Sequence, residues 1–425
     1  MLTPEITKKY IAILEEELVP AMGCTEPIAL AYAAALARKT LGMLPEAAEL
    51  AVSANIIKNV KSVIVPNTGN LRGIDAAAAA GIVAGDPERE LEVLASVTEE
   101  QIPKIREYLD TARITVRTAE SDLVFDIQVL LTAGEHSAFV RIAGNHTNVV
   151  RIEKDGQIRS TGSCTGASQP QKTDRSILNV ADIIDFADTV ALEEVTPILD
   201  RQISCNTAIA QEGLRGNWGA SIGKVLLAAY GDSVHNKAKA YAAAGSDARM
   251  SGCEMPVVIN SGSGNQGLTA SLPVIIYAQH LQSSQEQLYR ALLVSNLITI
   301  HLKTGIGCLS AYCGATSAGC GAGAGIAYLY GGKAWEISHT IVNAVAINSG
   351  MICDGAKPSC AAKIASAVEA GLMGMHMQQQ GTQFYGGDGI IVKGVENTIN
   401  NVGRLARVGM AETDREIIQI MIGSC

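Results

Sequence analysis

The sequence predicts an α+β protein in which a mostly helical domain carries an inserted, smaller α+β domain. Three observations support this prediction. Segments of alternating apolar and polar residues cluster between residues 113 and 161, a polar stretch rich in turn residues follows them, and helical patterns dominate after about Ile177. We therefore expect residues 1–86 and 177–425 to form the helical domain, and residues 87–176 to form the insertion with its linker.

The first part of the chain shows helical spacing from Thr3 to about Leu41, interrupted at residues 20–24. Pro27 suits the first turn of a helix, so a second helix is expected to begin there. The segment AELAVSANIIKNVKSVIVPNTGNLRG then predicts a strand, a short helix and a second strand, followed by a Gly/Asn loop and an Ala-rich helix from Ile74 to Val83.

The expected insertion begins with a strand near Glu90 and a helix from Glu99 to Leu109. The segments ITVRTA, LVFDIQVLLTA, SAFVRIAG and NVVRIEKDG then predict consecutive strands. After Leu268 the predicted helices combine Ala, Gly and Ser with branched apolar residues, which is typical of helices buried on several faces. With 42 glycines and only 4% aromatic residues, we expect close contact between helix backbones rather than a core filled with rings.

Charge and cysteine content narrow the function classes. A net charge of -9 disfavours nucleic acid and an anionic membrane as partners and favours a small molecule. The N-terminal segment has no signal-peptide pattern, and the most apolar segments are too short or too rich in glycine to cross a bilayer. We expect a cytoplasmic protein with no membrane partner, whose ten cysteines serve metal binding, catalysis or burial rather than disulfides.

Three cysteines outline a candidate metal site. Cys353 and Cys360 fall in MICDGAKPSC, where polar residues, glycine and proline predict a loop between two helices, and Cys313 lies one helical hairpin upstream. Three thiolates from two segments can hold an iron–sulfur cluster and leave one metal position open for substrate. Zinc also accepts three thiolates, although structural zinc sites usually show closer cysteine pairs and a fourth ligand. The structural alternative is that each cysteine is a small core hydrophobe.

Cys24 begins a predicted helix, where unpaired amides and the helix dipole favour a thiolate and lower the pKa of the thiol. Such a thiol can act as a base, and the alternative is a cysteine that faces the core. The glycine-containing loops at residues 66–73 and 260–267 free backbone N–H groups for an anion such as a carboxylate, or are ordinary helix-capping turns. For Arg249, in the segment SDARM, a surface salt bridge is the expectation, and for His146 a structural role.

Several function classes lack their motifs. The sequence contains no phosphate-binding P-loop, no dinucleotide fingerprint and no hydrolase triad pattern. Lys357 is not surrounded by a phosphate-binding cup, so pyridoxal phosphate is not expected.

Four motifs, GCTEPIAL, SDARM, SGSGNQG and GMICDGAKPSC, together resemble the L-cysteine desulfidase family, a branch of the iron–sulfur serine dehydratase alpha-chain superfamily. The resemblance covers nearly the full length. It implies a [4Fe-4S] cluster held by Cys313, Cys353 and Cys360, with Cys24 as the active-site thiol. It also implies two loops that bind the carboxylate of an amino acid, and the candidate substrate-binding residues are Asn67, Thr68, Gly69, Ser261, Ser263, Gly264 and Asn265.

The sequence ends at Cys425. In the related bacterial serine dehydratases a terminal cysteine folds back onto the fourth iron, so the resemblance makes Cys425 a candidate fourth ligand in the resting state. The alternative is a frayed tail.

The resemblance implies β-elimination from L-cysteine to hydrogen sulfide, pyruvate and ammonia, without pyridoxal phosphate, in a helical domain that is the catalytic one. Two alternatives stay open. The same site can serve an iron–sulfur L-serine dehydratase, or the protein can be a non-catalytic metal or redox sensor. A homodimer is expected for a metabolic enzyme of this kind.

Overall fold

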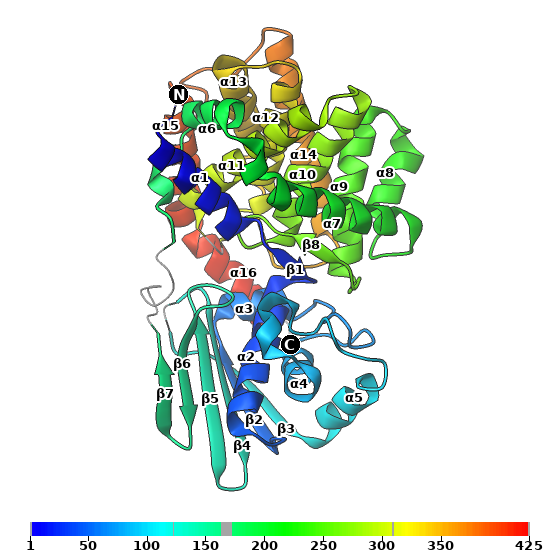
Figure 1. Ribbon diagram of the computed structural model, residues 1–425, viewed down its shortest axis with the longest axis vertical. Coiled ribbons are helices and arrows are strands. Elements are labelled where there is room, and N and C mark those ends of the chain that lie inside the picture. Colours follow the sequence, from blue (N-terminus) through cyan, green and yellow to red (C-terminus); the bar gives the residue numbers. More distant parts are fainter. Residues whose placement is uncertain (1, 122, 163–171, 308–309, 424–425) are drawn as a thin grey trace.

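The computed structural model describes residues 2–121, 123–162, 172–307 and 310–423, which form two lobes (Figure 1). The sheet lobe, residues 24–162, contains a six-stranded sheet covered by helices, and the helical lobe contains most of the remaining chain. The predicted class, a mostly helical α+β protein, is confirmed. The linker expected before Ile177 falls largely outside the described residues.

The helical lobe is built from long helices with short connections. Its α-helices are α1 (Pro4–Glu17), α6 (Val180–Thr189), α7 (Thr196–Arg215), α8 (Ile222–Tyr230), α9 (Val234–Met250), α10 (Gly264–His280), α11 (Gln285–Ile306), α12 (Gly314–Leu329), α13 (Ala334–Ile347), α14 (Cys360–Gln379) and α15 (Val395–Arg404). Short turns of 3₁₀- or π-helix are η2 (Arg175–Ile177), η3 (Leu192–Glu194) and η4 (Leu405–Gly409). Strands β1 (Pro20–Met22) and β8 (Pro256–Val258) pair where the two lobes meet, and α16 (Ala411–Gly423) lies between the lobes (Figure 1).

The sheet lobe combines four helices with a mixed sheet of order β3-β2-β4-β5-β6-β7. Its strands are β2 (Ala47–Val52), β3 (Arg113–Thr118), β4 (Asp126–Ala133), β5 (His136–Ala143), β6 (Val149–Lys154) and β7 (Gln157–Thr161). Its helices are α2 (Thr25–Leu41), α3 (Ala54–Val60), α4 (Ile74–Ala84), α5 (Ile102–Thr111) and the 3₁₀ turn η1 (Pro87–Glu92). β4 alternates buried and half-buried residues, as expected for a strand with one face on the core.

The sheet draws on more of the chain than the expected insertion. β2 pairs in parallel with β3 and antiparallel with β4, so residues 47–52 lie inside the sheet formed by residues 113–161. The chain enters the sheet lobe at α2, which packs on β4 and β5. The sequence hides this because β2 is separated from its partners by three helices, and strand pairing over such a distance leaves no local pattern.

Two of the predicted strands are not formed in the structure. Near Glu90 the chain forms η1, because Asp86 accepts the N–H of Glu88 at 3.1 Å and Pro87 occupies the first turn. The strand expected after the short helix makes only an isolated bridge between Ile64 and Arg72. The other predicted strands and the helices near residues 74–83 and 99–109 are present.

Backbone contact between helices sets the core of the helical lobe. The side chains of α12 from Ala315 to Ala327 are all buried, which confirms the prediction of helices buried on several faces. A Cβ atom placed on Gly319 would stand 2.2 Å from the carbonyl oxygen of Ala367 in α14, and one on Gly323 would stand 2.5 Å from that of Gly371. Only glycine admits this approach.

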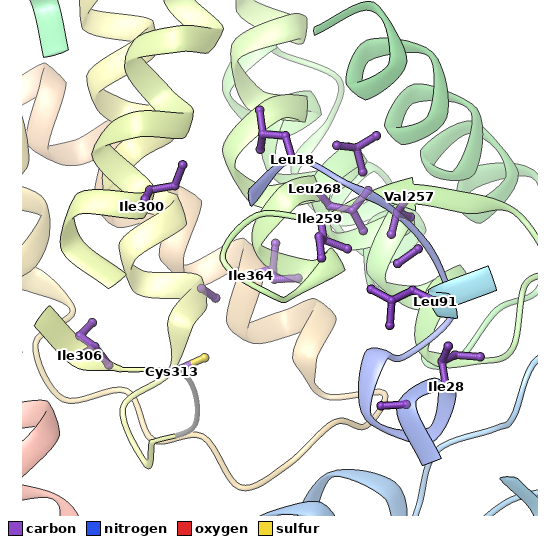
Figure 2. Close-up of a cluster of buried hydrophobic side chains, with 14 of the residues drawn as sticks. Leu18, Ile28, Leu91, Val257, Ile259, Leu268, Ile300, Ile306, Cys313 and Ile364 are labelled. Carbon is purple, nitrogen blue, oxygen red and sulfur yellow. The ribbon is translucent and has the colours of Figure 1, made fainter. Parts of the chain in front are cut away.

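The apolar core continues to the place where the lobes meet. Figure 2 shows Ile28 and Leu91 from the sheet lobe in the same cluster as Leu18 and Val257, with Cys313 at its edge. Cys313 lies between Ile306, the last residue of α11, and Ile364 of α14 (Figure 2). Its thiol is therefore fixed by a packed core on one side.

We predict that Gly319→Ala lowers the free energy of unfolding by about 1–3 kcal/mol, because the added methyl forces α12 and α14 apart. Urea denaturation monitored by circular dichroism measures the change. The matched control is Gly350→Ala, where an added Cβ meets no atom within 4 Å. Equal stability of the two variants would contradict the close-packing argument.

Candidate functional site

A cavity of about 360 Å³ receives side chains from both lobes. The sheet lobe contributes Cys24, Glu26, Lys58 and His146, among others, and the helical lobe contributes residues from the ends of α9, α10, α12 and α14. Four helices begin at this cavity: Cys24 is the N-cap of α2, Ser263 of α10 and Cys313 of α12, and Cys360 is the first residue of α14. Their unpaired N–H groups and dipoles make the cavity favourable for negative charge.

The structure brings Cys313, Cys353 and Cys360 to this cavity. Two backbone hydrogen bonds hold the first two segments side by side, from Cys313 N–H to Met351 O at 3.0 Å and from Cys353 N–H to Ala311 O at 2.6 Å. Cys360 N–H donates to Lys357 O at 3.0 Å, which closes the turn before α14. The three thiols thus come from rigid backbone rather than from a free loop.

The thiols interact with one another and with nearby cations. The thiol of Cys313 donates to Cys353, which together with the charges of Lys58 and Lys303 lowers the pKa of Cys353 to about 6 despite its burial. The same hydrogen bond and burial raise the pKa of Cys313. Burial also raises the pKa of Cys360. Cys353 is therefore the member of the triplet whose thiolate form is most favoured by its surroundings.

The donor set suits a metal cluster. Among the described residues, no three His, Cys, Asp or Glu side chains are arranged around a point that would hold one metal ion. An iron–sulfur cluster places its thiolates on separate iron atoms, so it accepts cysteines that stand further apart. The ammonium groups of Lys58, Lys303 and Lys363 line the same cavity and complement an anionic cluster. The three thiols and these ammonium groups therefore have the chemistry needed to hold an iron–sulfur cluster.

Cys24 lies at the start of α2, as expected, but its pKa is raised and not lowered. Burial is the main cause, since the residue is only 3% exposed, and the carboxylate of Glu26 adds to it while Arg249 opposes it. The thiol donates to Oε2 of Glu26 at 3.5 Å. The prediction of a thiolate was wrong because desolvation and a neighbouring carboxylate outweigh the helix dipole.

The loop before α10 contributes polar groups to the cavity. Ser261, Ser263 and Asn265 line it, and Gly264 lies beneath the side chain of Arg249. The hydroxyl of Thr25 donates to the carbonyl oxygen of Gly262 at 3.1 Å, which ties the loop to the start of α2 in the other lobe. The loop is therefore positioned by both lobes.

The loop at residues 66–73 is not part of the cavity lining. Asn67 is buried and donates to Leu94 O at 2.7 Å, and the hydroxyl of Thr68 donates to Val65 O at 2.7 Å. Gly69 accepts from Arg106 through its carbonyl oxygen at 2.7 Å. Asn67 Nδ2 also lies 3.6 Å from Sδ of Met22, so the loop packs beside the segment before Cys24 without lining the cavity.

Four residues of the cavity were not among the site residues expected from the sequence. Arg249 is 2% exposed, so the expected surface salt bridge is wrong. Glu26 is buried beside Cys24, and Lys58 is buried against the loop that contains Cys353, where its carbonyl oxygen faces Gly355. Burial lowers the pKa of His146, whose Nε2 has no hydrogen-bond partner among the described residues. Glu26 and Arg249 lie within GCTEPIAL and SDARM, so charged residues inside those motifs were the available signal.

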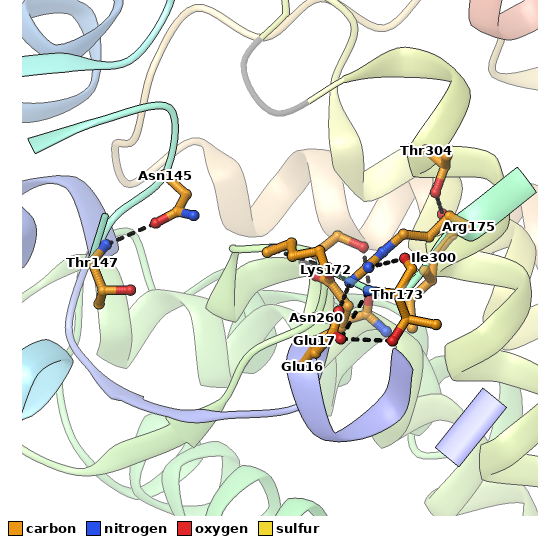
Figure 3. Close-up of polar contacts among 11 residues, drawn as sticks. Glu16, Glu17, Asn145, Thr147, Lys172, Thr173, Arg175, Asn260, Ile300 and Thr304 are labelled. Atoms are coloured by element: carbon orange, nitrogen blue, oxygen red, sulfur yellow. Dashed lines mark hydrogen bonds and ion pairs between the residues drawn. The ribbon is translucent and has the colours of Figure 1, made fainter. Parts of the chain in front are cut away.

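The edge of the cavity carries a compact ionic group. Figure 3 shows Lys172 and Arg175 close to Glu16 and Glu17, the last residues of α1. Arg175 Nη2 lies 2.7 Å from Glu17 Oε1, and Lys172 Nζ lies 3.5 Å from the same oxygen. Asn145 stands apart from this group and accepts the N–H of Thr147 at 3.1 Å (Figure 3). These cations are neutralised within the protein.

The C-terminal helix α16 is anchored next to the cavity. Lys58 Nζ lies 2.5 Å from Asp414 Oδ1, and the Lys58 side chain is only 1% exposed. Lys61 Nζ donates to Met421 O at 2.9 Å. Cys425, the candidate fourth ligand, lies outside the described residues.

In the part of the chain that the structure describes, no helix combines the length and the apolarity needed to cross a membrane.

The fold and the cavity define an enzyme-like protein whose site is lined by thiols at helix N-termini. Comparison with known proteins agrees, because the family model of the serine dehydratase alpha chain matches residues 88–419. A protein named UPF0597 from Desulfitobacterium hafniense (strain Y51) is 59% identical over 416 residues, covering 98% of this chain and 97% of the relative. UPF0597 proteins from Lachnoclostridium phytofermentans and Finegoldia magna are 51% and 47% identical, over 98% of this chain and 99% of each relative.

This chain belongs to the serine dehydratase alpha chain family. The predicted superfamily is therefore confirmed, and the family indicates an enzyme of the lyase class. The names of the relatives specify no substrate.

We predict that Asp414→Ala lowers the free energy of unfolding by about 3 kcal/mol, because it leaves the buried Lys58 ammonium without its partner. The double variant Lys58→Met/Asp414→Leu removes both charges and should recover most of that loss. Chemical denaturation of the metal-free protein measures both.

The matched control is Glu412→Ala on the same helix, whose ion pair with Arg415 is exposed and should change stability by less than about 0.5 kcal/mol. A loss no larger for Asp414→Ala than for this control would show that the Lys58 pair does not anchor α16.

Proposed function

We propose that this protein is an iron–sulfur-dependent L-cysteine desulfidase, which converts L-cysteine to hydrogen sulfide, pyruvate and ammonia by β-elimination. The observation that supports it most is the convergence of Cys313, Cys353 and Cys360 on one cavity with Cys24. Membership of the serine dehydratase alpha chain family supports the reaction type, since a dehydratase also eliminates a β-substituent.

In this proposal Cys313, Cys353 and Cys360 hold a [4Fe-4S] cluster. When bound, the cluster supplies a Lewis-acidic iron with an open position for the departing β-substituent. Lys58 and Lys303 lie near Cys353 and offset the negative charge of the bound thiolates.

Cys24 and Glu26 are the proposed proton acceptors. The thiol of Cys24 already donates to Oε2 of Glu26, so its proton can pass to the carboxylate as its sulfur takes the α-proton of the substrate. The electron pair of the Cα–H bond becomes the Cα–Cβ double bond, and the β-substituent leaves with the pair of the broken Cβ–S bond. The resulting enamine tautomerises and hydrolyses in water without further demands on the protein.

Polar groups of the loop before α10 are proposed to bind the substrate. Ser261, Ser263 and Asn265 line the cavity and offer hydroxyl and amide groups, while Gly264 gives room for Arg249. The assignment of Asn67, Thr68 and Gly69 rests on the resemblance alone. The capping role of Cys425 and a homodimer likewise stay predictions.

L-serine dehydratase is the second candidate, and the family match favours it specifically. The same residues can eliminate water from serine, because the proton acceptor and the open metal position are indifferent to whether sulfur or oxygen leaves. Thiolate is the better leaving group, which is why we place cysteine first. Sulfide and pyruvate release from cysteine and serine, measured side by side, separates the two.

We predict that the protein, reconstituted with iron and sulfide without oxygen, shows a brown, reducible chromophore and releases sulfide and pyruvate from L-cysteine. Cys353→Ser should lose the chromophore and the activity, because the cluster loses one of three ligands. Cys205→Ser is the control, since Cys205 does not line the cavity. A colourless, fully active protein would refute the proposal.

We predict that Cys24→Ser keeps the chromophore but lowers kcat by about 10²–10⁴-fold, because a serine hydroxyl is a much weaker acid than a thiol and passes its own proton to Glu26 far less readily. Absorption spectra and sulfide release report cluster and turnover separately. Unchanged turnover would remove Cys24 from the proton transfer.

A further inference from the structure

Arg249 is a buried cation without an acidic partner in the described part of the chain. The residue is 2% exposed. Its Nη1 donates to Oδ1 of Asn265 at 3.2 Å, while its buried Nε has no hydrogen-bond partner among the described residues. A guanidinium keeps its proton in proteins, and an unpaired buried charge is strongly unfavourable. The site therefore calls for an anion that the described protein residues do not supply.

The other cations of the cavity differ in this respect. Ion pairs are formed by Lys58 with Asp414, Lys172 with Glu17, Arg175 with Glu16 and Glu17, and Lys363 with Asp354. Those four charges each have a carboxylate partner inside the protein, and Lys303 of the same cavity donates to the carbonyl oxygen of Gly307. Arg249 differs from the four ion-paired cations because no carboxylate among the described residues pairs with it and its Nε has no hydrogen-bond partner there.

The backbone is shaped around the Arg249 guanidinium. A Cβ atom on Gly264, in the first turn of α10, would stand 2.3 Å from Nε of Arg249, so the absence of a side chain there lets the guanidinium cross the helix start. Asn265, the next residue, holds the Nη1 side. Asp247 does not compete, because residues two apart on a helix face away from each other, and it accepts the N–H of Gly223 at 3.1 Å instead.

Arg249 also lies close to the proposed reacting groups. Its charge and that of Glu26 both act on the thiol of Cys24, so Cys24 lies within electrostatic reach of each. Cys24 in turn belongs to the same packed cluster as Cys360, one of the three converging thiols. Arg249, Cys24 and the cysteine triplet all line one cavity, so a small molecule bound by Arg249 lies in the same space as the reacting groups.

We propose that Arg249 binds the α-carboxylate of the substrate, and that Asn265 positions its guanidinium for that contact. This inference rests on the proposed function for the identity of the substrate as an amino acid. A guanidinium pairs with a carboxylate through two parallel N–H donors, a geometry that an amide or an ester does not match. The substrate class is thus a small α-amino acid with a free carboxylate, whose β-substituent points to Cys313, Cys353 and Cys360.

Equilibrium binding tests this without turnover. The cluster-loaded protein is titrated without oxygen, by calorimetry, with L-alanine, which has no β-leaving group, and with L-alaninamide, which has no carboxylate. We expect saturable binding of L-alanine and binding of L-alaninamide at least about 100-fold weaker. Arg249→Gln should weaken L-alanine binding about 100-fold and abolish the preference over the amide.

Three further variants guard against misfolding and general charge effects. Arg249→Lys keeps the charge but loses the fork, so we expect a loss of about 10-fold. Asn265→Asp places a carboxylate on the guanidinium and should block L-alanine binding while the protein stays folded. Arg215→Gln is the control, since the Arg215 side chain is 82% exposed, and it should bind L-alanine like the wild type.

The inference is overturned if wild type and Arg249→Gln bind L-alanine equally, if L-alanine and L-alaninamide bind alike, or if the wild type shows no saturable L-alanine binding. Failure of the proposed function looks different. In that case the loaded protein binds L-alanine through Arg249 but releases neither sulfide nor pyruvate from cysteine or serine.

Discussion

The convergence of four helix N-termini on one cavity is the constraint on which the rest of this site depends. Each of α2, α10, α12 and α14 points unpaired N–H groups and the positive end of its dipole at the same space. The positive ends of these dipoles stabilise an anion in the cavity, such as a thiolate, a carboxylate or an anionic cluster. A cation in the cavity is stabilised only when it pairs with such an anion. The glycine contacts between α12 and α14 keep two of these helix starts in register, so the packing of the core and the chemistry of the cavity have one structural cause.

The two lobes share the site rather than meeting beside it. The sheet lobe contributes the Cys24–Glu26 pair and Lys58, and the helical lobe contributes the three converging thiols and Arg249. Polar links between the two lobes include the hydrogen bond from Thr25 to Gly262 O, the ion pair of Lys58 with Asp414 of α16, and the hydrogen bond from Lys61 to Met421 O. The mixed sheet packs on α2 through β4 and β5 and so supports the helix that begins at the cavity.

Much of the fold and the thiol triplet could be predicted from the sequence, and the reasons for the failures are physical. Small-residue composition predicted the buried helices, and the loop pattern around Cys353 and Cys360 predicted that these side chains could meet Cys313. The strand at residues 47–52 was expected within the helical domain, and its place in the sheet was not foreseen because its partners lie far along the chain. The pKa of Cys24 was misjudged because burial and the position of Glu26 are three-dimensional properties that helix position alone does not reveal.

The environment of Arg249 was also not predictable from its position in the sequence. In sequence, SDARM offers an aspartate two residues before an arginine, which suggests a surface pair. In the structure both residues are buried, and the helix directs them to different partners, Asp247 to the N–H of Gly223 and Arg249 to Asn265. Separation of two charges that could neutralise each other is unfavourable for folding, so the arrangement is understandable where a ligand completes it. The dipole of α9 also favours this arrangement. Arg249 lies in the last turn of α9, where the negative end of the helix stabilises a cation before any ligand binds.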